Sequence, residues 1–162
     1  MDDYKRAYED VNLDVIKNNV DIIMKRTKPG TKALIVVKAD AYGHGDVPVA
    51  RALESRADYF AVATGPEAIN LRENGITKPI LILGFVAYEE YEDLINNDVD
   101  LVIFDKESAD ALSEAAKKIG KTAKCHVKVD TGMRRIGVEP VKESVEIVKY
   151  IKGLDNVDAH GI

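Results

Sequence analysis

The chain has 162 residues, a length typical of one domain and sufficient to bury a sizeable core. Its 28 acidic and 23 basic residues leave a net charge of -5, and because the signs are mixed along the chain, no nucleic-acid-binding stripe is expected. No apolar run approaches the roughly 20 residues that cross a bilayer, so no membrane association is expected. The single cysteine, Cys125, excludes an internal disulfide, and without a signal peptide it indicates a cytoplasmic protein.

Helical and extended patterns alternate through the first half of the chain. The predicted elements, in order, are a helix over 12–26, a strand over 33–37, a helix from 46, a strand over 59–63, a helix over 66–75 and a strand over 79–84. Asn12 and Asp46 can cap their helices, and Pro48 and Pro66 suit a first helical turn. The strands are short, continuous apolar runs, which is typical of strands buried on both faces.

The same alternation continues to the last residue. The further predicted elements are a helix over 88–95, a strand over 100–104, a helix over 107–119, a strand over 123–129, a helix from 140 to about 153 and a strand over 157–162. Pro140 is expected to open the last of these helices. Six apolar strands separated by single helices indicate a parallel sheet, because parallel neighbours need crossover connections.

Two architectures satisfy this pattern: an open doubly wound sheet, and most of a barrel of eight strand-helix units. The first strand ends in a lysine rather than in the glycine triplet of a dinucleotide-binding fold, which favours the barrel. A complete barrel normally needs about 250 residues, more than this chain has. The sequence therefore predicts an α/β fold, an incomplete TIM-type (β/α) barrel of about six strand-helix units, without a second β domain.

The densest chemical signal is the stretch over 38–45, Lys-Ala-Asp-Ala-Tyr-Gly-His-Gly, which follows the first strand. Because side chains alternate along a strand, Lys38 continues a buried row at the point where the strand ends. A lone lysine at such a place is ordinarily solvated. A partly desolvated lysine amine, in contrast, loses its proton readily and can form a Schiff base with an aldehyde. Tyr42 would lie one helical turn away, on the lysine side, if the chain coils there.

This stretch resembles the cofactor-lysine motif of the alanine racemases, enzymes that use pyridoxal 5'-phosphate (PLP), over eight consecutive residues. The resemblance implies that Lys38 forms the Schiff base with PLP and is the base on one face of the substrate, and that Tyr42 contacts the cofactor phosphate. Without it, Tyr42 would be an amphipathic turn residue; His44 we interpret as a turn or cap residue in either case. Leu83 matches a family position near the cofactor ring, although core packing would explain it equally well.

A second dense stretch lies over 125–138. On its strand, Cys125 and Val127 can pack against helices, while His126 and Lys128 then point into the barrel. An isolated buried charge costs several kcal/mol, so Lys128 needs an anion beside it. On the residues alone, Arg135 would be a solvated loop residue.

The second stretch also resembles the alanine racemases, whose strand here reads Lys-x-Asp-Thr-Gly-Met followed, one residue on, by Arg-x-Gly. The resemblance implies that Lys128 carries a carbamate that holds Arg135, and that Arg135 contacts the cofactor's phenolic oxygen and the substrate carboxylate, for which a bidentate guanidinium is suited. The family usually has glycine where this chain has Arg134, and by register we assign the role to Arg135. The resemblance implies no metal ion.

The likeness covers residues 1–162 as the N-terminal part of the family's PLP-binding barrel, which is less than half of the family's length. It implies that an intact enzyme interconverts L- and D-alanine as a homodimer and serves D-alanine biosynthesis, which supplies a peptidoglycan precursor. The family's phosphate-binding loops and its mainly β second domain, which supplies the second catalytic tyrosine, lie beyond this sequence. We therefore expect the isolated chain to be inactive.

Two other interpretations stay open. The motifs do not fix the substrate, and another small amino acid such as serine would suit the same residues. In a different class of function, the isolated chain is a non-catalytic barrel fragment that self-associates through the open edges of its sheet. The particle mass in solution would separate a monomer from such an assembly, and the reading frame beyond Ile162 would test the family assignment.

Overall fold

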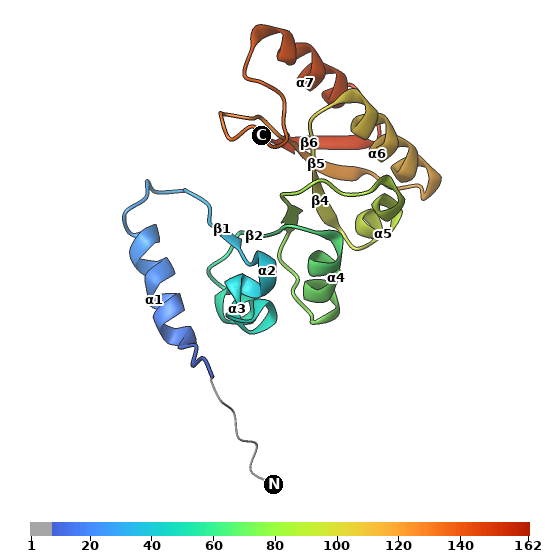
Figure 1. Cartoon of the computed structure of the whole chain (residues 1–162). Coiled ribbons are helices and arrows are strands. Elements are labelled where there is room, and N and C mark those ends of the chain that lie inside the picture. Colours follow the sequence, from blue (N-terminus) through green and yellow to red (C-terminus); the bar gives the residue numbers. More distant parts are fainter. Residues whose placement is uncertain (1–7) are drawn as a thin grey trace.

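The computed structural model describes residues 8–162, apart from the side chain of Glu143. Figure 1 shows an open arch in which helices lie outside a curved sheet. The sheet has six parallel strands in the sequential order β1-β2-β3-β4-β5-β6. Its strands are β1 (Leu34–Val36), β2 (Tyr59–Val62), β3 (Ile80–Ile82), β4 (Val99–Ile103), β5 (Ala123–Val127) and β6 (Val157–Gly161). The incomplete TIM-type barrel that the sequence predicts is therefore confirmed.

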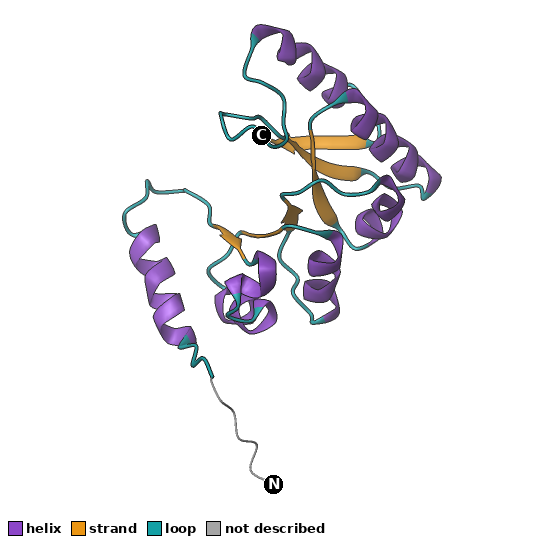
Figure 2. Ribbon diagram, viewed as in Figure 1, coloured by secondary structure: helices purple, strands orange, loops and turns teal. Residues whose placement is uncertain are grey.

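The helices lie outside the sheet: the first precedes β1, and the others connect successive strands on the outer side of the arch (Figure 2). They are α1 (Leu13–Met24), α2 (Lys38–Tyr42), α3 (Asp46–Leu53), α4 (Gly65–Glu73), α5 (Tyr91–Asn96), α6 (Lys106–Lys118) and α7 (Val145–Lys152), with single 3-10 turns η1 (Tyr88–Glu90) and η2 (Lys142–Ser144). Asn12 caps α1 as expected, because its Oδ1 accepts hydrogen bonds from the backbone N–H groups of Asp14 and Val15. The predicted start of the last helix at Pro140 is wrong: a loop and η2 precede α7, which begins at Val145.

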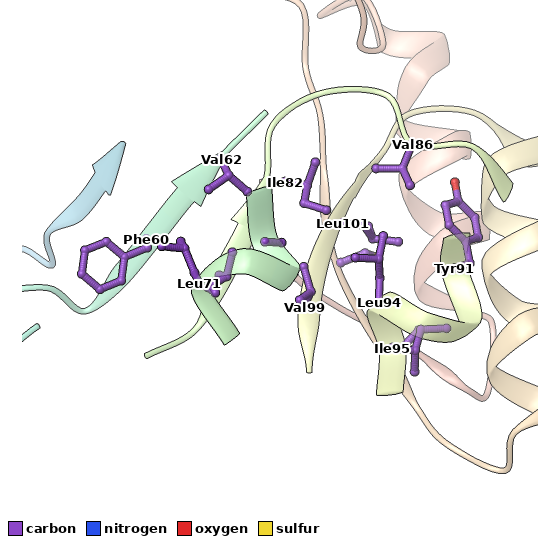
Figure 3. Packing of buried hydrophobic residues seen from close by; sticks show 14 of the residues in the cluster. Phe60, Val62, Leu71, Ile82, Val86, Tyr91, Leu94, Ile95, Val99 and Leu101 are labelled. Carbon is purple, nitrogen blue, oxygen red and sulfur yellow. The ribbon is translucent and has the colours of Figure 1, made fainter. Parts of the chain in front are cut away.

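The hydrophobic core lies between the sheet and the outer helices. Alternate strand residues, such as Phe60 and Val62 on β2, are fully buried there against Leu71 of α4 and Leu94 of α5 (Figure 3). Burying one such side chain contributes about 1.5–3 kcal/mol, so this layer holds the strands in place. Cys125 faces the same layer and is fully buried, as a small apolar residue would be.

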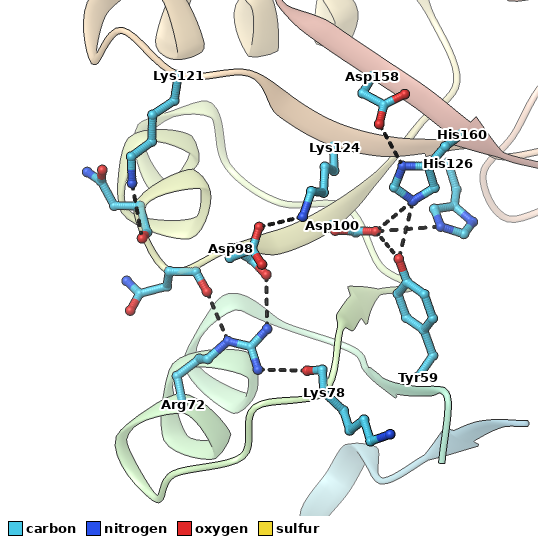
Figure 4. A network of polar contacts seen from close by, with 12 residues as sticks. Tyr59, Arg72, Lys78, Asp98, Asp100, Lys121, Lys124, His126, Asp158 and His160 are labelled. Carbon is cyan, nitrogen blue, oxygen red and sulfur yellow. Dashed lines mark hydrogen bonds and ion pairs between the residues drawn. The ribbon is translucent and has the colours of Figure 1, made fainter.

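The opposite, concave face of the sheet carries the other strand residues. Tyr59, Asp100 and His126 meet on this face, and their polar atoms approach one another (Figure 4). In a closed barrel this face is the interior, which is usually filled by branched apolar side chains. The chemistry-bearing residues of the chain therefore lie on the inside of the arch and along its rim.

The sheet order leaves β1 and β6 at its two ends, each paired with one neighbour within residues 8–162. Over the same residues, no helix is both long enough and apolar enough to span a membrane.

Candidate active site

A pocket of about 340 Å³ opens at the carboxyl ends of β1, β3 and β5. Lys38 enters it directly after β1, Leu83 after β3 and Lys128 after β5, and Arg135 reaches it from the loop that follows Lys128. Phe85 and Ile136 are among the residues that complete the wall. This is the end of the sheet at which (β/α) barrels carry their active sites. Four of the predicted site residues are thus brought together, although they come from stretches up to about a hundred positions apart.

The pocket is strongly cationic. Lys38, Lys128 and Arg135 line it, and no carboxylate does. Within residues 8–162, none of these three side chains makes a hydrogen bond or an ion pair. Like charges that share a small space repel one another, and a bound anion removes that cost. The donor set is therefore suited to a phosphate, a carboxylate or a phenolate.

The backbone that follows Lys38 is unusual. Although α2 has helical hydrogen bonds, Ala39, Asp40 and Ala41 have φ between +50° and +53°, and Tyr42 has φ +57°. This segment is a left-handed turn, a conformation that costs a residue with a Cβ roughly 1–2 kcal/mol. Such strain persists only where surrounding contacts impose it, and it is often found beside functional groups.

Glu67 is hydrogen-bonded to the start of the turn. Its carboxylate accepts a hydrogen bond from the backbone N–H of Ala39 at 2.8 Å, and another from the backbone N–H of Ala63 at 2.7 Å. Glu67 lies in the first turn of α4, so one side chain ties the residue next to Lys38 to the end of β2. Hydrogen bonds to a charged group are among the stronger ones in proteins, and this pair fixes where the lysine leaves the sheet.

Tyr42 does not reach the pocket. The left-handed turn carries its side chain to the surface, where it is 63% exposed, and it is not among the residues that line the Lys38 pocket. The expected right-handed coil would have returned the hydroxyl over the lysine, so the reversed handedness accounts for the difference. A phosphate contact by Tyr42 stays a prediction.

The loop after Lys128 presents Arg135. Asp130 Oδ1 accepts hydrogen bonds from the backbone N–H groups of Gly132 at 2.9 Å and Arg134 at 3.0 Å, and the N–H groups of Arg134 and then Gly132 hold the pKa of the Asp130 carboxyl below its usual value. Arg134 itself has φ +55° and lines a separate hollow with Asp130. Of the two neighbouring arginines, only Arg135 lines the Lys38 pocket.

A second polar cluster, made of Tyr59, Asp100, His126 and His160, lies on the concave face and was not predicted. Tyr59 Oη donates to Asp100 Oδ2 at 2.5 Å, and His160 Nε2 lies 3.0 Å from the same oxygen. Burial, and then the Asp100 carboxylate, raise the pKa of the Tyr59 phenol. Burial would raise the pKa of Asp100 as well, but its contacts with His126 and Tyr59 outweigh that effect and leave the pKa below its ordinary value. The sequence feature that could have indicated this cluster is the presence of polar residues within otherwise apolar strands.

Fold and site together define a (β/α) barrel segment with a lysine-bearing, anion-binding pocket at the carboxyl ends of its strands. A family model described as "Alanine racemase, N-terminal domain" matches residues 11–162. The alanine racemase of Methanococcus maripaludis is 45% identical over 156 residues, which are 96% of this chain and 42% of that protein. The chain thus belongs to the alanine racemase N-terminal domain family.

Solved structures agree with the sequence comparison. The alanine racemase of Clostridium difficile 630 in complex with cycloserine has a TM-score of 0.86 and 43% identity, over 93% of this chain and 41% of that chain. A histidine racemase from Leuconostoc mesenteroides subsp. sake has a TM-score of 0.81 and 28% identity, over 90% of this chain and 39% of that chain. The chain therefore spans about two fifths of the length of these relatives.

Proposed function

We propose that this chain supplies the cofactor-lysine part of a PLP-dependent amino-acid racemase that interconverts L- and D-alanine. The observation that carries the proposal is the set of three cations, Lys38, Lys128 and Arg135, which surround one pocket at the carboxyl ends of the strands and have no ion-pair partner among the described residues. The relatives that cover nearly all of the chain are named alanine racemases, which supports the choice of reaction and of substrate.

The pocket suits PLP in chemistry and in size. PLP carries a phosphate and a phenolic oxygen, both anionic, and a volume of about 340 Å³ lies within the usual range of small-molecule sites. Lys38 offers the amine that bonds to the cofactor's aldehyde, Leu83 an apolar contact for the ring and Arg135 a donor to the phenolic oxygen. Tyr42 lies outside the lining of this pocket, so its contact with the phosphate is proposed from the family resemblance alone. When bound, PLP supplies an electron sink that stabilises the negative charge left on the α-carbon of the substrate.

The chain's own residues then have distinct tasks. Lys38 takes the α-proton from one face of the substrate, or returns it there. Arg135 holds the substrate carboxylate through two parallel N–H donors. We propose that the neutral Lys128 amine adds to carbon dioxide and releases a proton, which leaves a carbamate anion that accepts hydrogen bonds from Arg135. This modification removes the repulsion between Lys128 and its two cationic neighbours.

Several finer features belong to the same proposal. The intact protein would act in the cytoplasm as a homodimer and supply D-alanine as a peptidoglycan precursor. Alanine is the substrate we propose, and another small amino acid such as serine is the alternative. The histidine racemase with a similar fold is named for a different amino acid, so the fold does not fix the substrate. A second candidate function, a non-catalytic assembly of barrel fragments, is favoured by the open edges of β1 and β6.

Reductive labelling tests the role of Lys38. The chain is mixed with PLP, reduced with borohydride and mapped by peptide mass, and the adduct is expected on Lys38. The matched control is Lys32→Arg, which removes an exposed lysine close by in the sequence and should leave the labelling of Lys38 unchanged. Adducts that occur only on other lysines would overturn the assignment.

An activity assay tests whether this chain alone is sufficient for catalysis. D-alanine formation from L-alanine with excess PLP should be absent for the 162-residue chain, because racemisation needs a base on each face and the pocket offers Lys38 as one of them. A longer protein that carries this sequence and the remaining part of the family's sequence should convert L-alanine to D-alanine. Turnover by the short chain that disappears in Lys38→Ala would contradict the expected inactivity while supporting the role of Lys38.

A further inference from the structure

Three metal-ligating side chains converge on the concave face, below the proposed cofactor pocket. Asp100 comes from β4, His126 from β5 and His160 from β6, and one ligand atom of each lies within 4.8 Å of the others (Figure 4). The Asp100 side chain is only 2% exposed, and those of His126 and His160 are 20% and 32% exposed. Neither histidine lines the Lys38 pocket, so this cluster is a separate site.

The polar atoms of the cluster are incompletely satisfied. Within the part of the chain that the structure describes, His126 Nε2 is the one buried side-chain nitrogen or oxygen without a hydrogen-bond partner. It lies 3.7 Å from Asp100 Oδ2, too far for a hydrogen bond and close enough to share a bound ion with it. An unpaired buried polar atom costs about 1–3 kcal/mol, so a ligand between these groups would relieve a real penalty.

His160 presents a second inconsistency. Its Nδ1 lies 3.2 Å from Asp158 Oδ2, and its Nε2 lies 3.0 Å from Asp100 Oδ2. A protonated imidazole would donate to both carboxylates, but in the neutral form, which is the form that binds a metal ion, one of its two nitrogens turns a lone pair toward a carboxylate. A cation between His160 Nε2 and Asp100 removes this conflict and leaves the Nδ1–H to donate to Asp158.

We propose that Asp100 Oδ2, His126 Nε2 and His160 Nε2 bind one divalent transition-metal ion, and that the ion is zinc. Zinc lies about 2.0–2.2 Å from nitrogen and carboxylate ligands, which places tetrahedral ligand atoms about 3.4 Å from one another. The distances of 3.0 Å and 3.7 Å from Asp100 Oδ2 to the two nitrogens lie on either side of that value.

The surroundings of the cluster fit this assignment. The nitrogen of a metal-bound histidine that does not bind the metal usually donates its N–H to a carboxylate. Asp158 is the corresponding partner here, because its Oδ2 lies 3.2 Å from His160 Nδ1. Tyr59 donates to Asp100 Oδ2 and orients the carboxylate in the same way. Two imidazole ligands select a transition metal over magnesium or calcium, which prefer oxygen. Cys125 is not a competing ligand, because it is fully buried in the hydrophobic core on the opposite side of the sheet.

The ion would join three consecutive strands at the end of the sheet. Because the ligands come from β4, β5 and β6, binding ties the last two strands to the middle of the arch. The site needs neither PLP nor alanine, so the zinc proposal can be tested independently of the proposed racemase activity.

Direct titration tests the site. The chain is stripped with a chelator, freed of it, and titrated with Zn²⁺ against a chromophoric competitor, with Mg²⁺ in a parallel arm. One tightly bound Zn²⁺ per chain and no response to Mg²⁺ are expected. The chain contains 3 histidines, so nitrogen NMR of the imidazoles can show Nε2 shifts at His126 and His160 and none at His44. Absence of stoichiometric binding, or shifts confined to His44, would overturn the proposal.

Variants separate ligation from folding. His160→Ala should abolish stoichiometric binding, and the control His44→Ala should bind Zn²⁺ as the parent chain does. Asp158→Asn changes a half-exposed residue and should fold normally, yet weaken Zn²⁺ affinity by about tenfold or more, as loss of a ligand's carboxylate partner does. Unchanged affinity in both His160→Ala and Asp158→Asn would overturn the proposal.

Discussion

The two ends of the sheet use cationic side chains in opposite ways. At the amino ends of β3 and β4, the Arg72 guanidinium donates to the carbonyl oxygens of Ile76, Lys78, Asn97 and Asp98 at 2.8–2.9 Å. Figure 4 shows the contacts with Lys78 and Asp98. At the carboxyl ends, Lys38, Lys128 and Arg135 have no such partners within residues 8–162. At one end the chain satisfies its own cations; at the other it leaves them available to a ligand. Stability and binding are thus assigned to opposite ends, as is usual in (β/α) barrels.

The largest expected effect is at the amino end. Arg72→Ala leaves partly buried carbonyls unpaired, and it should lower the free energy of unfolding by about 3 kcal/mol, since hydrogen bonds to a charged donor contribute roughly 1.5–3 kcal/mol each. Urea denaturation measures this. Arg26→Ala, at an exposed arginine with no side-chain hydrogen bond in the described part of the chain, is the matched control and should change little.

The same experiment at the carboxyl end should give the opposite result. Lys128→Met and Arg135→Met should leave the free energy of unfolding within about 1 kcal/mol of the parent value or raise it, because each removes a charge that repels its neighbours. A loss as large as that of Arg72→Ala would show that these cations stabilise the fold, and the contrast between the two ends would fail.

The second-largest effect is expected at Glu67, whose carboxylate accepts the backbone N–H groups of Ala39 and Ala63. Glu67→Gln replaces a carboxylate that accepts two backbone N–H groups by an amide with one acceptor oxygen, so the free energy of unfolding should fall by about 1–2 kcal/mol. Labelling of Lys38 by PLP and borohydride should also slow, because the left-handed turn loses its tie to β2. Glu73→Gln, on the same helix but exposed, should alter neither quantity. Equal labelling rates in the two variants would mean that Glu67 does not position the lysine.

A smaller effect is expected in the loop that presents Arg135. Arg134 has φ +55°, so Arg134→Gly should raise the free energy of unfolding by up to about 1 kcal/mol as the strain of a left-handed residue is removed. The neighbouring change Met133→Gly offers no such relief, since Met133 is not among the positive-φ residues, and it should not stabilise the chain. Thermal unfolding distinguishes the two. Stabilisation by both changes would point to loop flexibility instead.

The smallest effect is a pH response of the same loop. The pKa of Asp130 is depressed in the folded chain by the backbone N–H groups of Arg134 and Gly132. The stabilisation it provides is therefore complete above the ordinary value of 3.8 and is lost as the pH falls through the lower folded pKa. The amide NMR signals of Gly132 and Arg134 should shift in that acidic range. Asp130→Asn should remove the shift, and its persistence in this variant would assign the response to another group.

Local sequence signals were sufficient for most of the fold. Apolar runs and side-chain caps predict the strands and the first helix to within a few residues, because burial and capping act over short spans. The prediction that the last helix begins at Pro140 was wrong, because proline suits a first helical turn but does not require a helix to follow. That Lys38, Leu83 and the loop carrying Arg135 lie on one face could also be predicted, since each follows a strand and the carboxyl ends of parallel strands meet at one edge of the sheet.

Other features depend on contacts that no local pattern encodes. Ala39 and Tyr42 have no intrinsic preference for a left-handed turn, and Glu67, which accepts the Ala39 N–H, lies 28 residues further along the chain. The cluster of Tyr59, Asp100 and His160 forms because β2, β4 and β6 contribute to one layer of the concave face, which depends on the relative register of separate strands. Such registers follow from the assembled sheet and are not readable in any single strand.

The sequential strand order also has a consequence for synthesis. Each strand pairs only with those made immediately before and after it, so the arch can lengthen strand by strand as the chain leaves the ribosome. The growing sheet ends in the newest strand, which is paired with the preceding strand on one side and has an unpaired edge on the other. During translation, the most recent strand is therefore the place where two nascent copies would mispair, and each new helix and strand that follows covers that exposed edge in turn.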